Sequence, residues 1–233
     1  MRRGIRTGIF GLLIAAAGAW AASAAWQADF TPSTFNPGVG DVVSFAVCET
    51  CLGSGNGAAY RYLWDFNNDG VVDADTDSTA AACTFNAAGF YEVKLTIQDR
   101  GGREVTRRKG IFVGPVPAYG VRQVILESDG TVFVSIAIIV NSLASAPFLV
   151  ESVPAGWQLE IIDSGGSVTK MNTEERQLEV GWLSQAEAGD ELTFTYRLYS
   201  NYATQTRQLS GEVSGYIGGA RFAASVCGEL TVP

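Results

Sequence analysis

The chain has 233 residues, of which 47% are hydrophobic and 17% charged, and its formal net charge is −8. This balance allows a sizeable core, and the acidic sign argues against nucleic acid as a partner, because phosphate binding needs clustered Lys and Arg. Histidine is absent, which excludes Ser-His-Asp triads, Cys-His dyads and histidine zinc sites. The composition therefore favours a binding or structural protein over an enzyme.

The first 24 residues have the three parts of a secretory signal peptide. Three arginines lie within the first six residues, residues 8–22 are apolar, and Ala22-Ser23-Ala24 has the small-x-small pattern of a cleavage site. The alternative is an uncleaved membrane anchor, since the apolar run is about 18 residues long, the short limit for a spanning helix. We expect cleavage, and hence a secreted, extracellular or cell-envelope protein that contacts a membrane only through this segment if it stays attached.

Export makes the cysteines informative, because disulfides persist in oxidising compartments. The chain has an even set, Cys48, Cys51, Cys83 and Cys227, and we expect these to form disulfides with the connectivity left open. If all four pair within the chain, Cys227 must bridge the two predicted domains; the alternative is one bond within the first domain and a free or intermolecular thiol. A zinc ribbon or a thioredoxin-like site at the Cys-x-x-Cys motif is less favoured, since its partners are single and its flanks are predicted strands.

The rest of the chain alternates apolar and polar residues, which is typical of β-strands. In the first half, strands are predicted at 41–47, 60–66, 91–98 and 105–113. The third of these carries Val93, Leu95 and Ile97 on the face expected to be buried. Residues 114–117 (Gly-Pro-Val-Pro) then interrupt the pattern and mark a domain boundary.

A second set of strands follows this boundary. Strands are predicted at 132–140, 148–153, 157–162, 177–183, 192–199, 208–216 and 221–226. In the first of them Phe133 and Ile139 lie opposite the other apolar side chains, so this strand is predicted to be central and buried on both faces. No segment has a sustained helical period. The sequence therefore predicts an all-β protein with two tandem immunoglobulin-like β-sandwiches, at 28–114 and 119–233, after a signal peptide at 1–24.

The first of these regions resembles a PKD (polycystic-kidney-disease) domain. The resemblance rests on Leu-Trp-Asp-Phe at 63–66, on Gly-Phe-Tyr-Glu-Val-Lys-Leu-Thr-Ile at 89–97 and on Gln-Asp-Arg-Gly-Gly at 98–102. It implies an extracellular β-sandwich without catalytic residues, used in adhesion, spacing or carbohydrate-associated work. From the residues themselves, Trp64 is expected in the core and Asp65 is expected to accept hydrogen bonds from turn N–H groups.

The stretch that follows departs from the resemblance and matches the start of a calcium-binding loop. The ligands would be Asp65, Asn67, Asp69, the carbonyl of Val71, and Asp73. Gly70 allows the sharp turn, but the last ligand position holds Thr76 in place of a bidentate Glu, and the flanks are strands. Two interpretations stay open: a weak calcium site, with calcium as the one predicted cofactor, or an Asn/Asp-rich turn with solvated carboxylates.

The second region is similar to β-sandwich modules that occur beside PKD domains in prokaryotic surface proteins. The similarity rests on Glu-Ser-Val-Pro-Ala-Gly-Trp at 151–157, Val-Gly-Trp at 180–182 and Thr-Phe-Thr-Tyr at 193–196. It bears on architecture more than on activity. Both tryptophans are expected in the core, and the candidates for sugar stacking are Tyr199, Tyr202 and Tyr216, with ordinary surface tyrosines as the alternative.

The enzymatic alternative is a glycosidase with a pair of carboxylates. Glu160 and Asp163 are predicted to point to opposite faces of one strand, and no Gly-x-Ser-x-Gly motif occurs. We therefore expect a non-catalytic secreted or cell-surface module for adhesion or scaffolding, in contact with an extracellular protein or polysaccharide. The alternative function is a calcium-dependent carbohydrate-binding accessory protein of an extracellular hydrolase system.

Overall fold

The computed structural model describes residues 26–52, 60–200 and 206–232. The predicted signal peptide at 1–24 lies outside these residues. The described chain consists of β-strands and one short 3-10 helix, η1 (Glu49–Leu52), so the predicted all-β class is confirmed. In this part of the chain no helix is long and apolar enough to cross a membrane.

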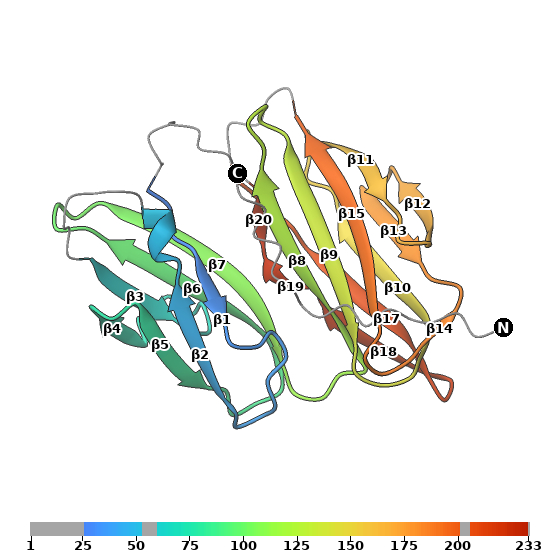
Figure 1. Cartoon of the computed structure of the whole chain (residues 1–233), viewed down its shortest axis with the longest axis horizontal. Coiled ribbons are helices and arrows are strands. Elements are labelled where there is room, and N and C mark those ends of the chain that lie inside the picture. Colours follow the sequence, from blue (N-terminus) through green and yellow to red (C-terminus); the bar gives the residue numbers. More distant parts are fainter. Residues whose placement is uncertain (1–25, 53–59, 201–205, 233) are drawn as a thin grey trace.

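The first half is a sandwich of two sheets (Figure 1). One sheet has the order β1-β2-β5 and consists of β1 (Phe30–Pro32), β2 (Val42–Val47) and β5 (Ala80–Thr84). The opposing strands have the order β7-β6-β3-β4 and are β3 (Arg61–Asp65), β4 (Ala74–Thr76), β6 (Gly89–Gln98) and β7 (Glu104–Val113). The four strands predicted for this half are present as β2, β3, β6 and β7.

A single aromatic-rich core lies between these sheets. Trp64 is fully buried, as predicted, and its ring centroid lies 5.2 Å from that of Phe30 and 5.6 Å from that of Phe45. The predicted inward face of β6 is also fully buried: Val93, Leu95 and Ile97. Alternate residues of a strand lie on the same face, so the alternation in the sequence was sufficient to predict which side chains of β6 enter the core.

The second half is also a sandwich (Figure 1). One set of strands has the order β11-β15-β9-β8 and consists of β8 (Ala118–Leu126), β9 (Val132–Val140), β11 (Gln158–Asp163) and β15 (Glu191–Tyr199). The facing sheet has the order β12-β13-β10-β17-β18 and consists of β10 (Ala144–Ser152), β12 (Val168–Asn172), β13 (Gln177–Gly181), β17 (Gly211–Ile217) and β18 (Ala220–Ser225), with β14 (Gln185–Ala186) beside β10.

The long strand β9 is central in its sheet, between β8 and β15, but only one of its faces is buried. Its even-numbered residues from 132 to 140 are buried in the core, whereas Phe133 and Ile139 on the opposite face are half-exposed. The prediction of burial on both faces was therefore wrong. Apolar side chains on both faces look the same in a sequence whether the second face meets another layer or solvent.

One short strand joins the two halves. β19 (Cys227–Glu229) pairs antiparallel with β7, with Gly228 opposite Gly110, and parallel with β8, with Cys227 opposite Val121. These pairings merge strands of both sandwiches into one nine-stranded sheet in the order β11-β15-β9-β8-β19-β7-β6-β3-β4. The red strand β19 accordingly lies between the green strands β7 and β8 (Figure 1), and β20 (Thr231–Val232) then pairs with β16 (Arg207–Gln208).

Candidate functional site

A buried ion pair anchors the joining strand in the second sandwich. Arg122 of β8 donates two hydrogen bonds to Glu151 of β10, from Nε to Oε2 at 3.1 Å and from Nη2 to Oε1 at 2.6 Å, and a third to the backbone carbonyl of Glu229 in β19 at 2.8 Å. The hydroxyl of Tyr196 donates to Oε2 of Glu151 at 3.0 Å. Arg122 is 1% exposed and Glu151 0%, so each charge depends on the other for compensation.

The pKa values in this cluster follow from burial and from the ion pair. Burial raises the pKa of Glu151, and the Arg122 guanidinium offsets part of that rise. Burial lowers the pKa of Arg122, but Glu151 and Tyr196 outweigh it, so the net shift is upward. Burial, with the Glu151 charge beside it, raises the pKa of Tyr196 well above its ordinary value. These residues are locked into a structural contact and have no exposed proton to transfer.

A second set of ion pairs crosses the junction nearer to solvent. The Glu229 carboxylate lies 2.7 Å from Nη2 of Arg107 and 2.9 Å from Nζ of Lys109, both on β7. Nζ of Lys109 lies 2.8 Å from Oδ1 of Asp29. Two acids and two bases thus balance each other around β19, and this charge balance fixes the joining strand against the first sandwich.

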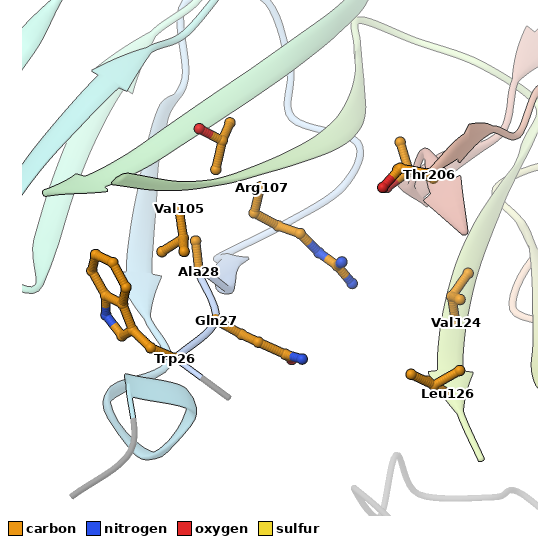
Figure 2. A pocket seen from close by; sticks show the side chains of 10 residues that line it. Trp26, Gln27, Ala28, Val105, Arg107, Val124, Leu126 and Thr206 are labelled. Carbon is orange, nitrogen blue, oxygen red and sulfur yellow. The ribbon is translucent and has the colours of Figure 1, made fainter. Parts of the chain in front are cut away.

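A cleft opens between the two halves where β19 ends. It has a volume of about 360 Å³, within the range typical of ligand sites, roughly 300–1,000 Å³. Its lining comes from both halves: Trp26, Gln27, Ala28, Val105, Thr106 and Arg107 on one side, and Val124, Leu126, Thr206 and Thr231 on the other. Figure 2 shows Gln27 and Arg107 extending from the first half toward β8, where Val124 and Leu126 lie opposite.

The polar and apolar groups of the cleft are unevenly divided. The indole of Trp26 is already engaged, because it stacks on Tyr60 at 5.9 Å between centroids and the Arg103 guanidinium lies 5.0 Å from its centre. Leu126 on the opposite wall is 55% exposed. The cleft therefore offers an apolar wall facing an amide and a guanidinium, and it suits an extended chain with both apolar and polar groups better than a sugar ring stacked on tryptophan.

The only disulfide among the described residues supports one wall of this cleft. Cys48 is bonded to Cys51 through η1. The backbone N–H of Gln27 donates to the carbonyl of Cys51 at 3.2 Å, and the N–H of Cys48 donates to the carbonyl of Asp29 at 2.9 Å. The disulfide turn thereby holds the segment 27–29 against the first sandwich.

The other two cysteines are free thiols, both within the described chain. Cys227 is buried at the junction, its Sγ lies 3.7 Å from the carbonyl oxygen of Phe35, and burial raises its pKa to about 12. Burial, followed by the nearby Asp73 charge, also raises the pKa of the half-exposed Cys83. The predicted pairing of all four cysteines, with Cys227 as a covalent bridge, is thus not present in the structure; hydrogen bonds and ion pairs join the halves instead.

The loop predicted to bind calcium is organised by hydrogen bonds to its own backbone. Asp65 is buried, and its carboxylate accepts from the N–H groups of Asp69 and Gly70, at 3.2 and 3.0 Å, as expected for a turn. Asp73 accepts from the N–H of Phe66 at 2.7 Å. The remaining predicted ligand side chains, Asn67 and Asp69, hydrogen-bond to each other at 3.0 Å, and Val71 donates its N–H to Asp69 at 2.8 Å.

These contacts leave the carboxylates of the loop apart. Among the described residues, the one group of three Cys, Asp or Glu side chains close enough to share a metal ion is Asp29 with Cys48 and Cys51, whose thiols are already in the disulfide. The carboxylates of Asp65 and Asp69 already accept backbone N–H groups of the loop. Calcium at this loop stays a prediction.

A calcium titration tests whether the 65–73 loop binds the ion. We expect the chain to bind Ca²⁺ no more tightly than about 10⁻⁴ M, as extracellular modules do. Asp69→Asn should weaken that binding further, because it removes an exposed carboxylate charge from the loop. Isothermal calorimetry of the full chain measures both. Asp129→Asn, in another exposed turn, is the matched control and should leave the titration unchanged. A Kd of about 10⁻⁵ M or below would contradict the expectation.

The aromatic residues singled out in the second half lie partly in the core and partly on the surface. The predicted core tryptophans Trp157 and Trp182 are buried, as expected. Tyr199 (38% exposed, β15) and Tyr216 (47% exposed, β17) belong to opposite sheets and form no common platform, and Tyr202 lies outside the described residues. No sequence signal pointed to the cleft, because its walls come from separate segments of the chain, at 26–28, 105–107, 124–126, 206 and 231.

The carboxylates considered for catalysis lie on an open face. A register shift in β11 places Glu160 opposite Arg197 and Asp163 opposite Thr195, so both acids lie on the same face of the strand. The prediction of opposite faces was wrong because a β-bulge adds a residue to the alternation. Both acids are exposed, and neither lines the cleft.

Comparison with known proteins identifies the first half. Residues 32–109 match the family model of the PKD domain, which confirms the resemblance inferred from the Trp-Asp-Phe and Gly-x-Tyr-x-Val motifs. The sequence matches no curated protein.

A search of solved structures finds distant similarities to this chain. One is described as carbohydrate-binding modules from the β-sandwich superfamily (14% identity, 89% of this chain and 98% of the other, TM-score 0.35). Others are a collagen adhesin from S. aureus (11%, 90% and 95%, 0.30) and the major pilin SpaD from Corynebacterium diphtheriae (9%, 73% and 58%, 0.40). Likeness at this level bears on neither ligand nor activity.

Proposed function

We propose that the protein is a non-catalytic module of the cell surface or extracellular space that binds an extended polymer, a protein segment or a polysaccharide, in the cleft between its two sandwiches. The PKD match of the first half supports an adhesion or scaffolding role. The observation that carries the proposal is the cleft itself, which has one wall from each half and is held open by the continuous sheet through β19.

The strand edges that face the cleft add backbone groups to its side chains. β19 pairs only with residues 109–110 of β7 and 121–122 of β8. Beyond it, the facing edges of β7 and β8 continue to Glu104 and Leu126, and no described strand pairs with them there. An extended chain can therefore receive main-chain hydrogen bonds as well as contacts with Gln27, Arg107 and Leu126.

A pair of neighbouring substitutions tests this site. Leu126→Asp places a carboxylate on the apolar wall, and we expect it to weaken binding at least tenfold, a loss of about 1.4 kcal/mol. Ile125→Asp is the matched control, because Ile125 is 56% exposed against 55% for Leu126 but lies outside the cleft lining. Both variants should keep the unfolding midpoint of the parent.

The measurement is a binding screen of the full chain against immobilised polysaccharides and fibrous extracellular proteins, with and without a calcium chelator. Loss of binding in Leu126→Asp alone supports the cleft. Equal loss in both variants, or retention in both, contradicts it. Loss of binding with chelator but not with Leu126→Asp would favour the calcium-dependent carbohydrate-binding alternative at the 65–73 loop.

A further inference from the structure

An exposed strand edge on the first sandwich lies far from the cleft. β5 is the terminal strand of the order β1-β2-β5, and no other described strand pairs with its outer side. It lies at the outer side of the first sandwich, beside β2 (Figure 1). Its sequence, Ala-Ala-Ala-Cys-Thr, contains neither charge nor proline, the devices that usually protect such edges from pairing with another chain.

The register of β5 on β2 shows which of its backbone groups face outward. Val47 donates to the carbonyl of Thr79 at 2.8 Å and Gly40 donates to that of Phe85 at 2.8 Å, so odd-numbered residues of this strand direct their polar groups toward β2. By alternation, Ala82 and Thr84 direct theirs outward. The edge thus has backbone donors and acceptors without a described strand partner on both sides of Cys83, although the Cys83 thiol lies 3.7 Å from the Thr84 carbonyl oxygen.

Cys83 is a free thiol on this edge. It is half-exposed, it packs beside the core through the inner face of β5, and it lines a cavity of about 360 Å³ together with Phe66, Asn67, Asp73 and Tyr91. The free thiol and the unpaired edge are independent features. The edge can pair with a strand of another chain, and the thiol can form a disulfide with a cysteine on that strand. Buried Cys227 has no such access.

We propose that two copies of this chain pair antiparallel through β5 and form a disulfide between their Cys83 residues. Outward-facing Ala82 of one copy and Thr84 of the other form the hydrogen-bonded pairs, which places the two Cys83 residues in the non-hydrogen-bonded pair between them. Such pairs have Cα atoms about 4.5 Å apart, within the roughly 4.4–6.8 Å that a disulfide spans. The two-fold axis is perpendicular to the sheet, so both thiols lie on the same face.

The charges near this edge set the strength of the contact. Asp73, Asp75 and Asp77 lie on and beside the neighbouring β4, and the two-fold axis brings both sets together. Arg61 neutralises Asp75 through an ion pair. The remaining repulsion keeps the non-covalent pair weak at low ionic strength, so added salt should promote dimerisation and the disulfide should make it permanent.

The oxidation is tested with glutathione disulfide, a low-molecular-weight disulfide, as oxidant. One Cys83 thiolate attacks it and releases one glutathione thiol; the thiol of the second copy then displaces the other, so two protein thiols are oxidised as one glutathione disulfide is reduced. We expect a covalent dimer on non-reducing gels, twice the monomer mass by light scattering, and a Cys83–Cys83 cross-linked peptide by mass spectrometry.

Four variants complete the test. Cys83→Ser should give no covalent dimer, and Cys227→Ser should leave it unchanged. Ala82→Pro removes an outward N–H without affecting pairing to β2, and Ala82→Lys adds charge to the edge; each should cut dimer formation at least tenfold and leave Cys83 as its glutathione adduct. The proposal would be overturned if both Ala82 variants formed as much dimer as the parent chain. A cross-link through Cys227, or a parent chain that gives only the glutathione adduct, would also overturn it.

Discussion

Replacing Arg122 by methionine is expected to lower the free energy of unfolding by about 3–5 kcal/mol, because it leaves the Glu151 carboxylate buried without a counter-charge. The same change removes the donor to the carbonyl of Glu229 and so loosens β19. Urea unfolding followed by tryptophan fluorescence measures the loss. The double variant Arg122→Met/Glu151→Leu should recover most of it, since both charges are then gone.

The pH dependence of this variant identifies the cause. Burial already raises the pKa of Glu151 in the parent protein, and without Arg122 that pKa rises further. A carboxyl group whose pKa is higher in the folded than in the unfolded state stabilises the fold below its unfolded pKa and loses that contribution as pH rises. Arg122→Met should therefore become more stable, relative to the parent, as pH falls from 7 toward 5. A pH-independent difference, or a double variant as unstable as the single one, would contradict this account.

The second large effect is expected at Gly228 in the middle of β19. Gly228 has a φ of +80°, and a Cβ there would lie 2.2 Å from the backbone oxygen of Arg122. Gly228→Ala should cost about 4–5 kcal/mol and expel β19 from the sheet. We expect the single unfolding transition to split into two, one for each sandwich, with faster amide exchange at the facing edges of β7 and β8.

The matched control is Gly130→Ala. Gly130 has nearly the same backbone conformation, with a φ of +82°, but nothing lies within 4 Å of its added Cβ. Its cost should be limited to backbone strain, about 1–3 kcal/mol. If Gly228→Ala cost no more than Gly130→Ala, the tight contact between β19 and β8 would not be what holds the halves together.

Much of the fold can be predicted from local alternation. The strands around Trp64 and Val93 and the turn at Asp65 follow from period two, aromatic burial and Asx chemistry, each of which depends on near neighbours. β19 could not be predicted in this way, because three residues have no period and its partners Gly110 and Val121 were assigned to different domains. The bulge in β11 was also missed, because the apolar–polar pattern of the sequence does not show where a strand contains an extra residue.

The candidate site was less predictable than the fold. The motif-based candidate, the 65–73 loop, could be located from the sequence because its residues are contiguous. The cleft could not, because Trp26, Arg107 and Leu126 come together only through the packing of two halves around β19. The distant pairing of Glu151 with Arg122 was also invisible, although a glutamate placed on an otherwise apolar strand face was a signal that a buried partner exists.

β19 also constrains the order in which the molecule can assemble. It is the latest in sequence of the nine strands in its sheet, yet it occupies a position near the middle. During synthesis each sandwich can therefore collapse on its own core, but the two cannot be joined until residues 227–229 are made and insert between edges already formed. Until then the edges of β7 and β8 are open to the wrong partners, so we expect the slowest phase of refolding to be the docking of this strand.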